Sequence, residues 1–279
     1  MITPHPLHST MAIKALPVGT AAPKNGICIR YFRRQDSDNV RDLFLLAMSN
    51  GPGSPRRLAL NAMLTKPAAN VAYALIIIGL SITYVSRSPT TKALGCMLSI
   101  LLATVFLGYR HLLDKSFTDF YAKCLTEDLA DIASHYRMKP AQDDTEDYVP
   151  SGPSGFWVVE CELPDKSGAE IIGCVGLDSR YEDDVLRGRL CRLNVSPYHR
   201  RKGIAALLVQ TLLDHAREHE VSVVDLTTTH FQEAAIVFYG KLGWVEVGRD
   251  VIREAYGLIR LVLIHFRMEL DTLPLKRLK

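Results

Sequence analysis

The residues best suited to chemistry lie in one short segment that ends an apolar strand and begins an amphipathic helix. It runs from Val195 to Ala205 and reads Val-Ser-Pro-Tyr-His-Arg-Arg-Lys-Gly-Ile-Ala. Gly203 permits close approach of the backbone to a ligand, and the small side chain of Ala205 leaves the helix start uncrowded. Unpaired N–H groups at a helix N-terminus favour a phosphate or pyrophosphate group. Positive charge at the rim of this predicted anion site comes from Arg200, Arg201 and Lys202.

A second pattern lies on a later predicted helix, Gln232 to Leu242, which stops at Gly243 because glycine suits the position after a helix. It reads Ala235-x-x-x-Tyr239-x-x-x-Gly243-Trp244. Together the two patterns resemble those of the GNAT acetyltransferase superfamily. In that family Arg/Gln-x-x-Gly-x-Gly/Ala follows the fourth strand, and Asn-x-x-Ala-x-x-x-Tyr-x-x-x-Gly-Phe forms a later helix. Gln232 stands at the Asn position, and Trp244 at the Phe position.

The resemblance implies a role for each matched position. Backbone amides of the basic turn hold the CoA pyrophosphate, which assigns to it Arg200, Arg201, Lys202, Gly203, Ile204 and Ala205. The preceding strand splays from its neighbour so that pantetheine pairs with its backbone, which assigns Leu193, Asn194 and Val195 to the pantetheine and the thioester. Gln232 is assigned beside CoA, and Tyr239 falls where the family often places a phenol near the CoA sulfur.

These roles predict direct transfer of an acetyl group from acetyl-CoA to a primary amine. The N–H of Val195 is expected to polarise the thioester carbonyl, and Tyr239 to protonate the departing thiolate. The route by which the amine loses its proton stays open. A water relay or one of Asp225, His230 and Glu160 could accept the proton, or the amine could arrive already deprotonated. Cys191 lies on the motif strand, but a cysteine in an apolar strand more often contributes packing than a nucleophile.

The segment from residue 68 to residue 109 differs from the composition of a soluble enzyme. Ala68 to Val85 and Ala93 to Tyr109 contain no charged residue. As helices each would reach about 25–27 Å, at the short end of what spans a hydrocarbon core. Helices of a soluble core normally carry a polar stripe, so we predict a membrane hairpin, spanning or re-entrant. The flanking Lys and Arg residues favour both ends on the cytosolic side.

A hydrophobic hairpin inserted into a GNAT domain resembles the camello-like membrane-bound N-acetyltransferases. The local match runs from Ser196 to Ala205 and is preceded by Asp183, Asp184 and Arg187. The resemblance implies an enzyme of the endoplasmic reticulum membrane whose catalytic domain faces the cytosol. Its acceptor would be a cysteine S-conjugate, an amino acid such as aspartate, or a protein lysine. A catalytically silent CoA-binding or scaffold module at a membrane is the alternative.

The order of predicted elements indicates an α/β fold of the mixed α+β kind, with a mostly antiparallel sheet flanked by helices. Residues 1–25 are expected to form a disordered tail, and 26–279 a single acetyltransferase domain interrupted by the hairpin at 68–109. Strands are expected at 27–31, 156–161, 171–177, 190–195, 221–227, 245–247 and 257–266, and helices at 118–137, 203–219 and 232–242, with another beginning at Asp36 or Ser37. Residues 139–155 and the acidic stretch that contains Asp178 and Glu182 are expected to be loops.

The bulk composition argues against two classes of function. A formal net charge of +3 on 279 residues leaves no basic field for nucleic acid. The six cysteines form no CxxC pair, and the nine histidines show no ligand spacing with them, so no metal is expected.

Overall fold

The computed structural model describes residues 26–141, 147–162, 168–182, 185–254 and 259–270. The predicted tail at 1–25, the acidic pair Asp183 and Asp184, and the start of the strand predicted at 257–266 lie outside the described residues.

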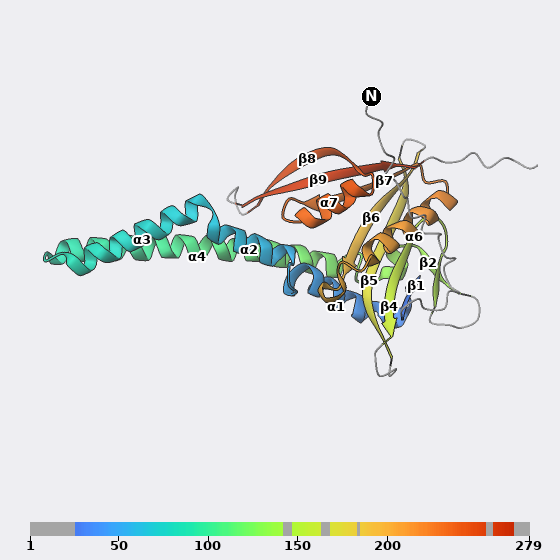
Figure 1. The fold of residues 1–279 in the computed structure, drawn as a ribbon, viewed down its shortest axis with the longest axis horizontal. Helices are drawn as coiled ribbons and strands as arrows, with labels where there is room; N and C mark the ends of the chain where they lie inside the picture. Colours follow the sequence, from blue (N-terminus) through green and yellow to red (C-terminus); the bar gives the residue numbers. More distant parts are fainter. Residues whose placement is uncertain (1–25, 142–146, 163–167, 183–184, 255–258, 271–279) are drawn as a thin grey trace, which may run out of the picture.

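A seven-stranded sheet forms the centre of the molecule, in the order β1-β4-β5-β6-β7-β9-β8 (Figure 1). Among the described strands, β6 and β7 pair in parallel and the other neighbours pair antiparallel. The predicted mixed, mostly antiparallel sheet is therefore confirmed. The strands are β1 (Ile27–Tyr31), β4 (Gly155–Glu162), β5 (Ala169–Glu182), β6 (Val185–Val195), β7 (Val223–Thr229), β8 (Val245–Glu254) and β9 (Ile259–Glu269).

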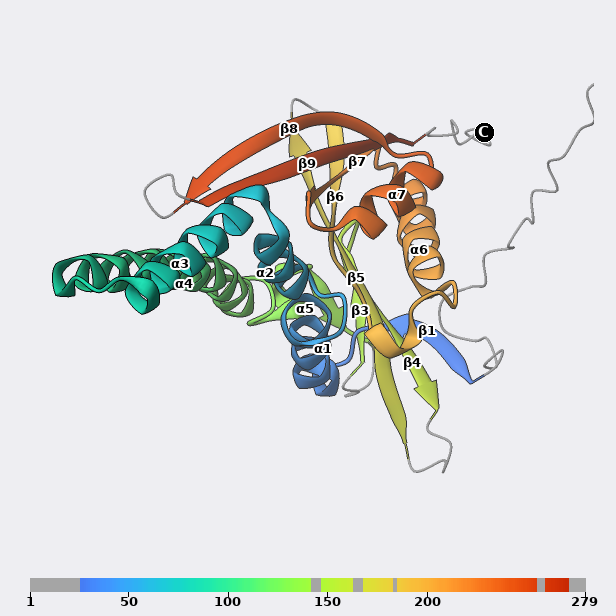
Figure 2. The same cartoon turned by 60° about the vertical axis from the view of Figure 1, so that its left-hand side comes forward.

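Helices cover both faces of the sheet, and each face has its own apolar core. Helices α6 (Ile204–Glu218) and α7 (Glu233–Lys241) cover one face, where Trp157, Leu208 and Leu212 are fully buried. The opposite face packs against α1 (Ser37–Leu45) and the inner part of α4 (Pro89–Thr126), as Figure 2 shows for α1. The shorter elements are η1 (Arg34–Asp36), η2 (Leu46–Asn50), α2 (Pro55–Thr65), α5 (Ile132–His135) and η3 (Pro197–His199).

Helices α3 (Pro67–Val85) and α4 form a long antiparallel pair that projects from the domain (Figure 1). Both are long and apolar enough to cross a membrane by length and composition, and only 11% of the apolar window of each is buried. The two helices approach closely where Gly79 faces Ser99. The absence of a side chain at Gly79 permits this approach, since a Cβ there would collide with the Ser99 hydroxyl. That hydroxyl donates to the carbonyl of Ile76 at 3.1 Å.

The prediction of one helix at 118–137 is wrong in both bounds, since α4 ends at Thr126 and the short α5 follows it. Residues 93–126 belong to the single helix α4, because no proline or turn separates the apolar run from the polar part. The helix α2 was not predicted, since the Gly-Pro segment before it obscured that Pro55 begins a new helix at its first position.

Two predicted loops contain strands. The pairing of β5 with β6 continues through Asp178 to Glu182, because the ladder supplies hydrogen-bond partners for the backbone peptide groups of this stretch. Within 139–155, β2 (Met138–Pro140) pairs with β3 (Tyr148–Pro150).

Candidate active site

The two parallel strands β6 and β7 separate within the sheet. Their ladder pairs Arg187 with Val223 and ends at the pair Arg189 and Asp225. Both strands continue beyond that pair, β6 to Val195 and β7 to Thr229, without pairing to each other. The unpaired backbone of β6 therefore faces a gap in the middle of the sheet.

A bulge in β6 marks the start of the gap. Cys174 of β5 opposes Asn194 and Gly176 opposes Cys191, so two residues of β6 face one of β5. One of them, Arg192, has φ +52°, a left-handed conformation that costs a non-glycine residue about 1 kcal/mol or more.

An ion pair between β6 and the segment after α4 holds this bulge. The guanidinium of Arg192 donates to both carboxylate oxygens of Asp128, at 2.6 and 2.5 Å. The hydroxyl of Tyr136 donates to Asp128 at 3.0 Å, and the Arg192 guanidinium also lies over the ring of Phe44. Burial raises the pKa of Asp128, but the hydrogen bonds and charge of Arg192, together with the hydrogen bond from Tyr136 and the charge of His135, keep the pKa below its usual value. We had not predicted this pair; its one signal in the sequence is an arginine inside an apolar strand.

The N–H of Val195 points into the gap. Ser196, the next residue, donates its N–H to Ile172 of β5 at 2.8 Å. Because successive amides along a strand point to opposite sides, the Val195 N–H points away from β5 and toward β7. This is the geometry needed to donate to a carbonyl bound along β6. The neighbouring Asn194 is buried and donates its amide to the carbonyl of Arg192 at 3.1 Å, so its side chain supports the bulge. Leu193 packs on the core beneath α6 and α7.

The turn that follows β6 ends at the start of α6. Gly203 is the cap residue with φ +82°, and no side chain caps the helix. Among the described residues, the N–H groups of Ile204, Ala205 and Ala206 have no hydrogen-bond acceptor. A Cβ on Gly203 would meet no atom within 4 Å, so the space beside this residue is open. Such a helix start suits an anion.

The basic side chains of this turn divide into two groups. Arg201 and Lys202 are exposed beside the helix start, where they are free to reach an anion. The guanidinium of Arg200 instead donates to the carbonyl of Pro52 at 3.1 Å and lies 3.5 Å from that of Ala47. Arg200 therefore ties the turn to the segment between η2 and α2. The Ile204 side chain is buried in the core, which leaves its amide for the anion.

Helix α7 supplies Tyr239 on the far side of the gap, and Gln232 is the residue just before that helix. Tyr239 is 7% exposed, and its ring packs against Trp244 and Phe266. Burial raises its pKa well above its usual value, so the phenol stays protonated. Gln232 accepts a hydrogen bond from Thr228 of β7 at 2.7 Å, which orients the amide at the end of the strand.

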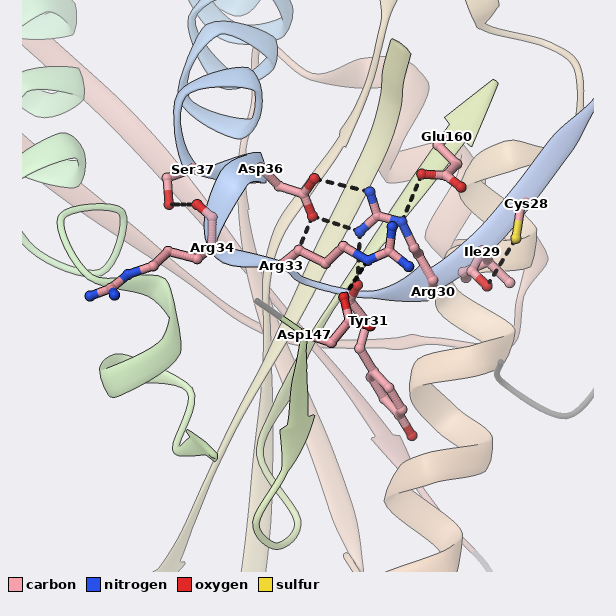
Figure 3. Close-up of polar contacts among 10 residues, drawn as sticks. All are labelled: Cys28, Ile29, Arg30, Tyr31, Arg33, Arg34, Asp36, Ser37, Asp147 and Glu160. Carbon is pink, nitrogen blue, oxygen red and sulfur yellow. Dashed lines mark hydrogen bonds and ion pairs between the residues drawn. The ribbon is translucent and has the colours of Figure 1, made fainter. Parts of the chain in front are cut away.

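The three candidate bases lie apart from one another. Asp225 pairs with Arg267 at 2.7 Å, and Glu160 lies on β4 with its carboxylate 2.7 Å from Arg30 (Figure 3). His230 accepts at Nδ1 from the N–H of Val262, and burial lowers its pKa. Both carboxylates are thus engaged by arginines, and Glu160 is separated from β6 by β5.

Cys191 lies on β6 just before the bulge. Burial raises the pKa of its thiol to about 11. A thiol in that state is a weak nucleophile at neutral pH.

Two buried hydroxyls near the gap lack partners. Ser196 directly follows β6, and Thr229 is the last residue of β7. Neither Ser196 Oγ nor Thr229 Oγ1 has a hydrogen bond within the described residues. Buried polar atoms are normally paired, so these orphan atoms suit a polar ligand lying between the strands. In the part of the chain that the structure describes, no group of three or more His, Cys, Asp or Glu side chains is placed to hold a metal ion.

A mixed sheet opened between its two parallel strands, with an uncapped glycine turn at the opening, defines a GNAT-type acetyltransferase. Residues 116–244 match the model of the acetyltransferase (GNAT) family. Mouse N-acetyltransferase 8 is 32% identical over 242 residues, which cover 85% of this chain and 92% of that protein. Human N-acetylaspartate synthetase is 29% identical over 234 residues, which cover 82% of this chain and 67% of that protein. The chain therefore belongs to the N-acetyltransferase 8 family of GNAT acetyltransferases.

Among solved structures, one similar chain is YncA of Salmonella typhimurium, a putative acetyltransferase determined with its cofactor acetyl-CoA. It is 14% identical with a TM-score of 0.41, and the match covers 90% of this chain and 97% of that one.

Proposed function

We propose that this protein is a membrane-anchored N-acetyltransferase that moves the acetyl group of acetyl-CoA to a primary amine by direct transfer. The observation that carries the proposal is the gap between β6 and β7, which ends at the uncapped start of α6. A strand edge with free peptide groups suits pantetheine, and the helix start suits a pyrophosphate. Acetyl-CoA supplies an activated acyl group at this site.

The residues of the chain have separate tasks in this scheme. The amides from Gly203 to Ala206, with Arg201 and Lys202 beside them, bind the pyrophosphate. The Val195 N–H polarises the thioester carbonyl, where negative charge develops as the amine attacks. The Tyr239 phenol, kept protonated by burial, donates a proton to the sulfur as the carbon–sulfur bond breaks. Arg200 keeps the turn in place through the η2–α2 segment.

Membrane anchoring is proposed from the exposed apolar pair α3 and α4. The stem of the pair also forms a wall beside the site. Tyr121 of α4 donates to the carbonyl of Met48 at 2.7 Å, and Phe117 packs against Phe231, which follows β7. A site built on the stem of a membrane hairpin suits an acceptor that is amphipathic or delivered at the membrane. The proposed location is the endoplasmic reticulum membrane, with the catalytic domain in the cytosol.

The acceptor belongs to one of three classes, a free amino acid, a cysteine S-conjugate or a protein lysine. The amino-acid class is supported by the name of the similar human protein, N-acetylaspartate synthetase. Transfer from radiolabelled acetyl-CoA to a panel of all three classes and polyamines, with the full chain in microsomes, tests the proposal. Acetylation of one class is expected, and no product with any amine would contradict it. Protease protection of the same microsomes tests the topology: cleavage near Arg200 without detergent is expected, and protection would exclude a cytosolic site.

A further inference from the structure

A polar groove crosses the sheet on the face opposite α6 and α7. It has a volume of about 500 Å³, and residues from β5 to β9 line it. Three of the lining side chains form a connected chain that none of the roles above uses. They are Thr227 of β7, His265 of β9 and Asp250 of β8.

The hydrogen bonds of this chain have a direction. Thr227 Oγ1 lies 3.0 Å from His265 Nδ1, and His265 Nε2 lies 3.0 Å from Asp250 Oδ2. A carboxylate only accepts hydrogen bonds, so Nε2 carries the imidazole proton. The Nδ1 of the neutral ring is then an acceptor, and the Thr227 hydroxyl donates to it. The lone pairs of the Thr227 oxygen remain available to accept a proton from outside the chain.

Thr227 stands at the opening of the gap between the parallel strands. The last ladder pair joins Arg189 and Asp225. Thr227 and Cys191 each lie two residues beyond it, and since side chains alternate along a strand, both are on the groove face. The gap starts at this point, and the positions assigned to pantetheine and the thioester, Leu193 to Val195, begin two residues beyond Cys191 on β6. Tyr239 belongs to the core of the other face. The proton donor to the thiolate and the proton acceptor from the amine would therefore lie on opposite faces of the sheet.

We propose that Thr227, His265 and Asp250 form the proton relay that deprotonates the acceptor amine, an inference that rests on the proposed acetyl transfer. Thr227 accepts a proton from the acceptor ammonium and passes its own hydroxyl proton to His265 Nδ1. Asp250 stabilises the resulting imidazolium. The free amine then forms a bond with the carbonyl carbon while the carbon–sulfur bond breaks, and its second proton reaches the sulfur by way of Tyr239. His265 finally releases its proton to water in the groove.

Asp250 is the carboxylate that contacts His265 directly. Asp225 lies two residues before Thr227 on β7, and Arg267 and Arg187 engage its carboxylate, at 2.7 and 3.6 Å. The imidazole thus receives its orientation from Asp250, and Asp225 belongs to a separate arginine cluster. The titratable and charged groups that line the groove are Asp178, Arg180 and Glu182 of β5, Arg187 and Arg189 of β6, Asp225 of β7, Asp250 of β8, and His265 and Arg267 of β9.

The test measures acetyl transfer by the full chain in detergent micelles, with an amine accepted by the wild type. Thr227→Val removes the hydroxyl while keeping the shape, and we expect kcat to fall on the order of 100-fold with little change in KM for acetyl-CoA. Thr227→Ser restores the hydroxyl and should recover most of kcat. His265→Gln should remove one ionisation from the pH profile of kcat/KM, and the exposed His111→Gln on α4 is the matched control. A Thr227→Val enzyme with wild-type kcat and an unchanged pH profile would overturn the relay.

A second measurement separates failure of the relay from failure of the proposed function. The ¹⁵N chemical shifts of the His265 ring, assigned by comparison with His265→Gln, report its tautomer without any turnover. The relay requires the Nε2–H tautomer in the wild type and its loss in Asp250→Asn; an Nδ1–H ring would overturn the relay. If no amine is acetylated, the proposed function fails while the tautomer still decides whether the relay exists.

Discussion

Arg192 on the bulge of β6 and Asp128 after α4 are joined by two hydrogen bonds of 2.6 and 2.5 Å, although 64 positions separate them in the chain. Arg192 has φ +52°, and its partner Asp128 is 5% exposed. The pair therefore links the strained backbone of the β6 bulge to the segment that follows α4.

Removing one member of this pair should destabilise the protein strongly. Asp128→Ala leaves a mostly buried guanidinium without its partner, so we expect the free energy of unfolding to fall by about 3–5 kcal/mol. The double variant Asp128→Leu with Arg192→Met removes both charges and should be less destabilised than Asp128→Ala. Denaturant unfolding in micelles measures both variants. Equal stabilities of the wild type and Asp128→Ala would show that the pair does not hold the bulge.

Gly203→Val should weaken acetyl-CoA binding. The φ of +82° is unfavourable for a side chain, with a cost of about 1–2 kcal/mol, and relief of that strain would turn the amides of α6 away from the pyrophosphate. We expect the Kd for acetyl-CoA, measured by calorimetry, to rise at least about tenfold. The control is Gly152→Val, since a Cβ at Gly152 also meets nothing within 4 Å and its φ is not positive. A Gly203→Val protein that binds like the control would contradict the assigned site.

Tyr239→Phe should lower kcat and leave the fold intact. The ring keeps its contacts with Trp244 and Phe266, while the proton donor to the sulfur is lost. CoA thiolate is a fair leaving group, so we expect a decrease of about 10- to 100-fold, at the low end for general acid catalysis. Stopped-time product assays measure it, with the exposed Tyr181→Phe on β5 as the control. Unchanged kcat would remove Tyr239 from the mechanism.

Acidification should destabilise the core beneath α6 through His215. Burial, followed by the charge of His219, lowers the pKa of His215 from 6.5 to about 4. Between these values the unfolded chain binds a proton that the folded chain does not. The stabilisation is therefore complete above pH 6.5 and is lost as the pH falls toward 4, with a total on the order of 3 kcal/mol.

Fluorescence of Trp157, whose ring centroid lies 5.0 Å from that of His215, follows unfolding in this pH range. His215→Gln retains an amide able to donate to the carbonyl of Gly152, the partner of His215 at 3.2 Å, and it should flatten the pH dependence. A wild-type unfolding free energy that is constant from pH 6.5 to pH 4 would contradict the shift.

Features that depend on contiguous residues could be predicted from the amino-acid sequence alone. The Gly203 turn, the helix that stops at Gly243 and the two uncharged runs all follow from local chemistry. A left-handed cap needs glycine, with φ +89° at Gly243, and a long helix without charges needs an apolar environment. The order of the predicted elements was enough to predict the mixed sheet, and the two uncharged runs were enough to predict a pair of long apolar helices.

Contacts between residues that are distant in the sequence could not be predicted and became visible in the folded chain. The sequence pattern assigned Arg200 to the anion, but its guanidinium binds the η2–α2 segment, because the fold brings unpaired carbonyls within its reach. Asp225 and Glu160 were equally plausible bases until strand register placed each beside an arginine. Thr227, His265 and Asp250 carry no common signal, since three separate strands supply them. Register determines which face a side chain takes, and long-range pairing determines register, so these contacts are absent from any local pattern.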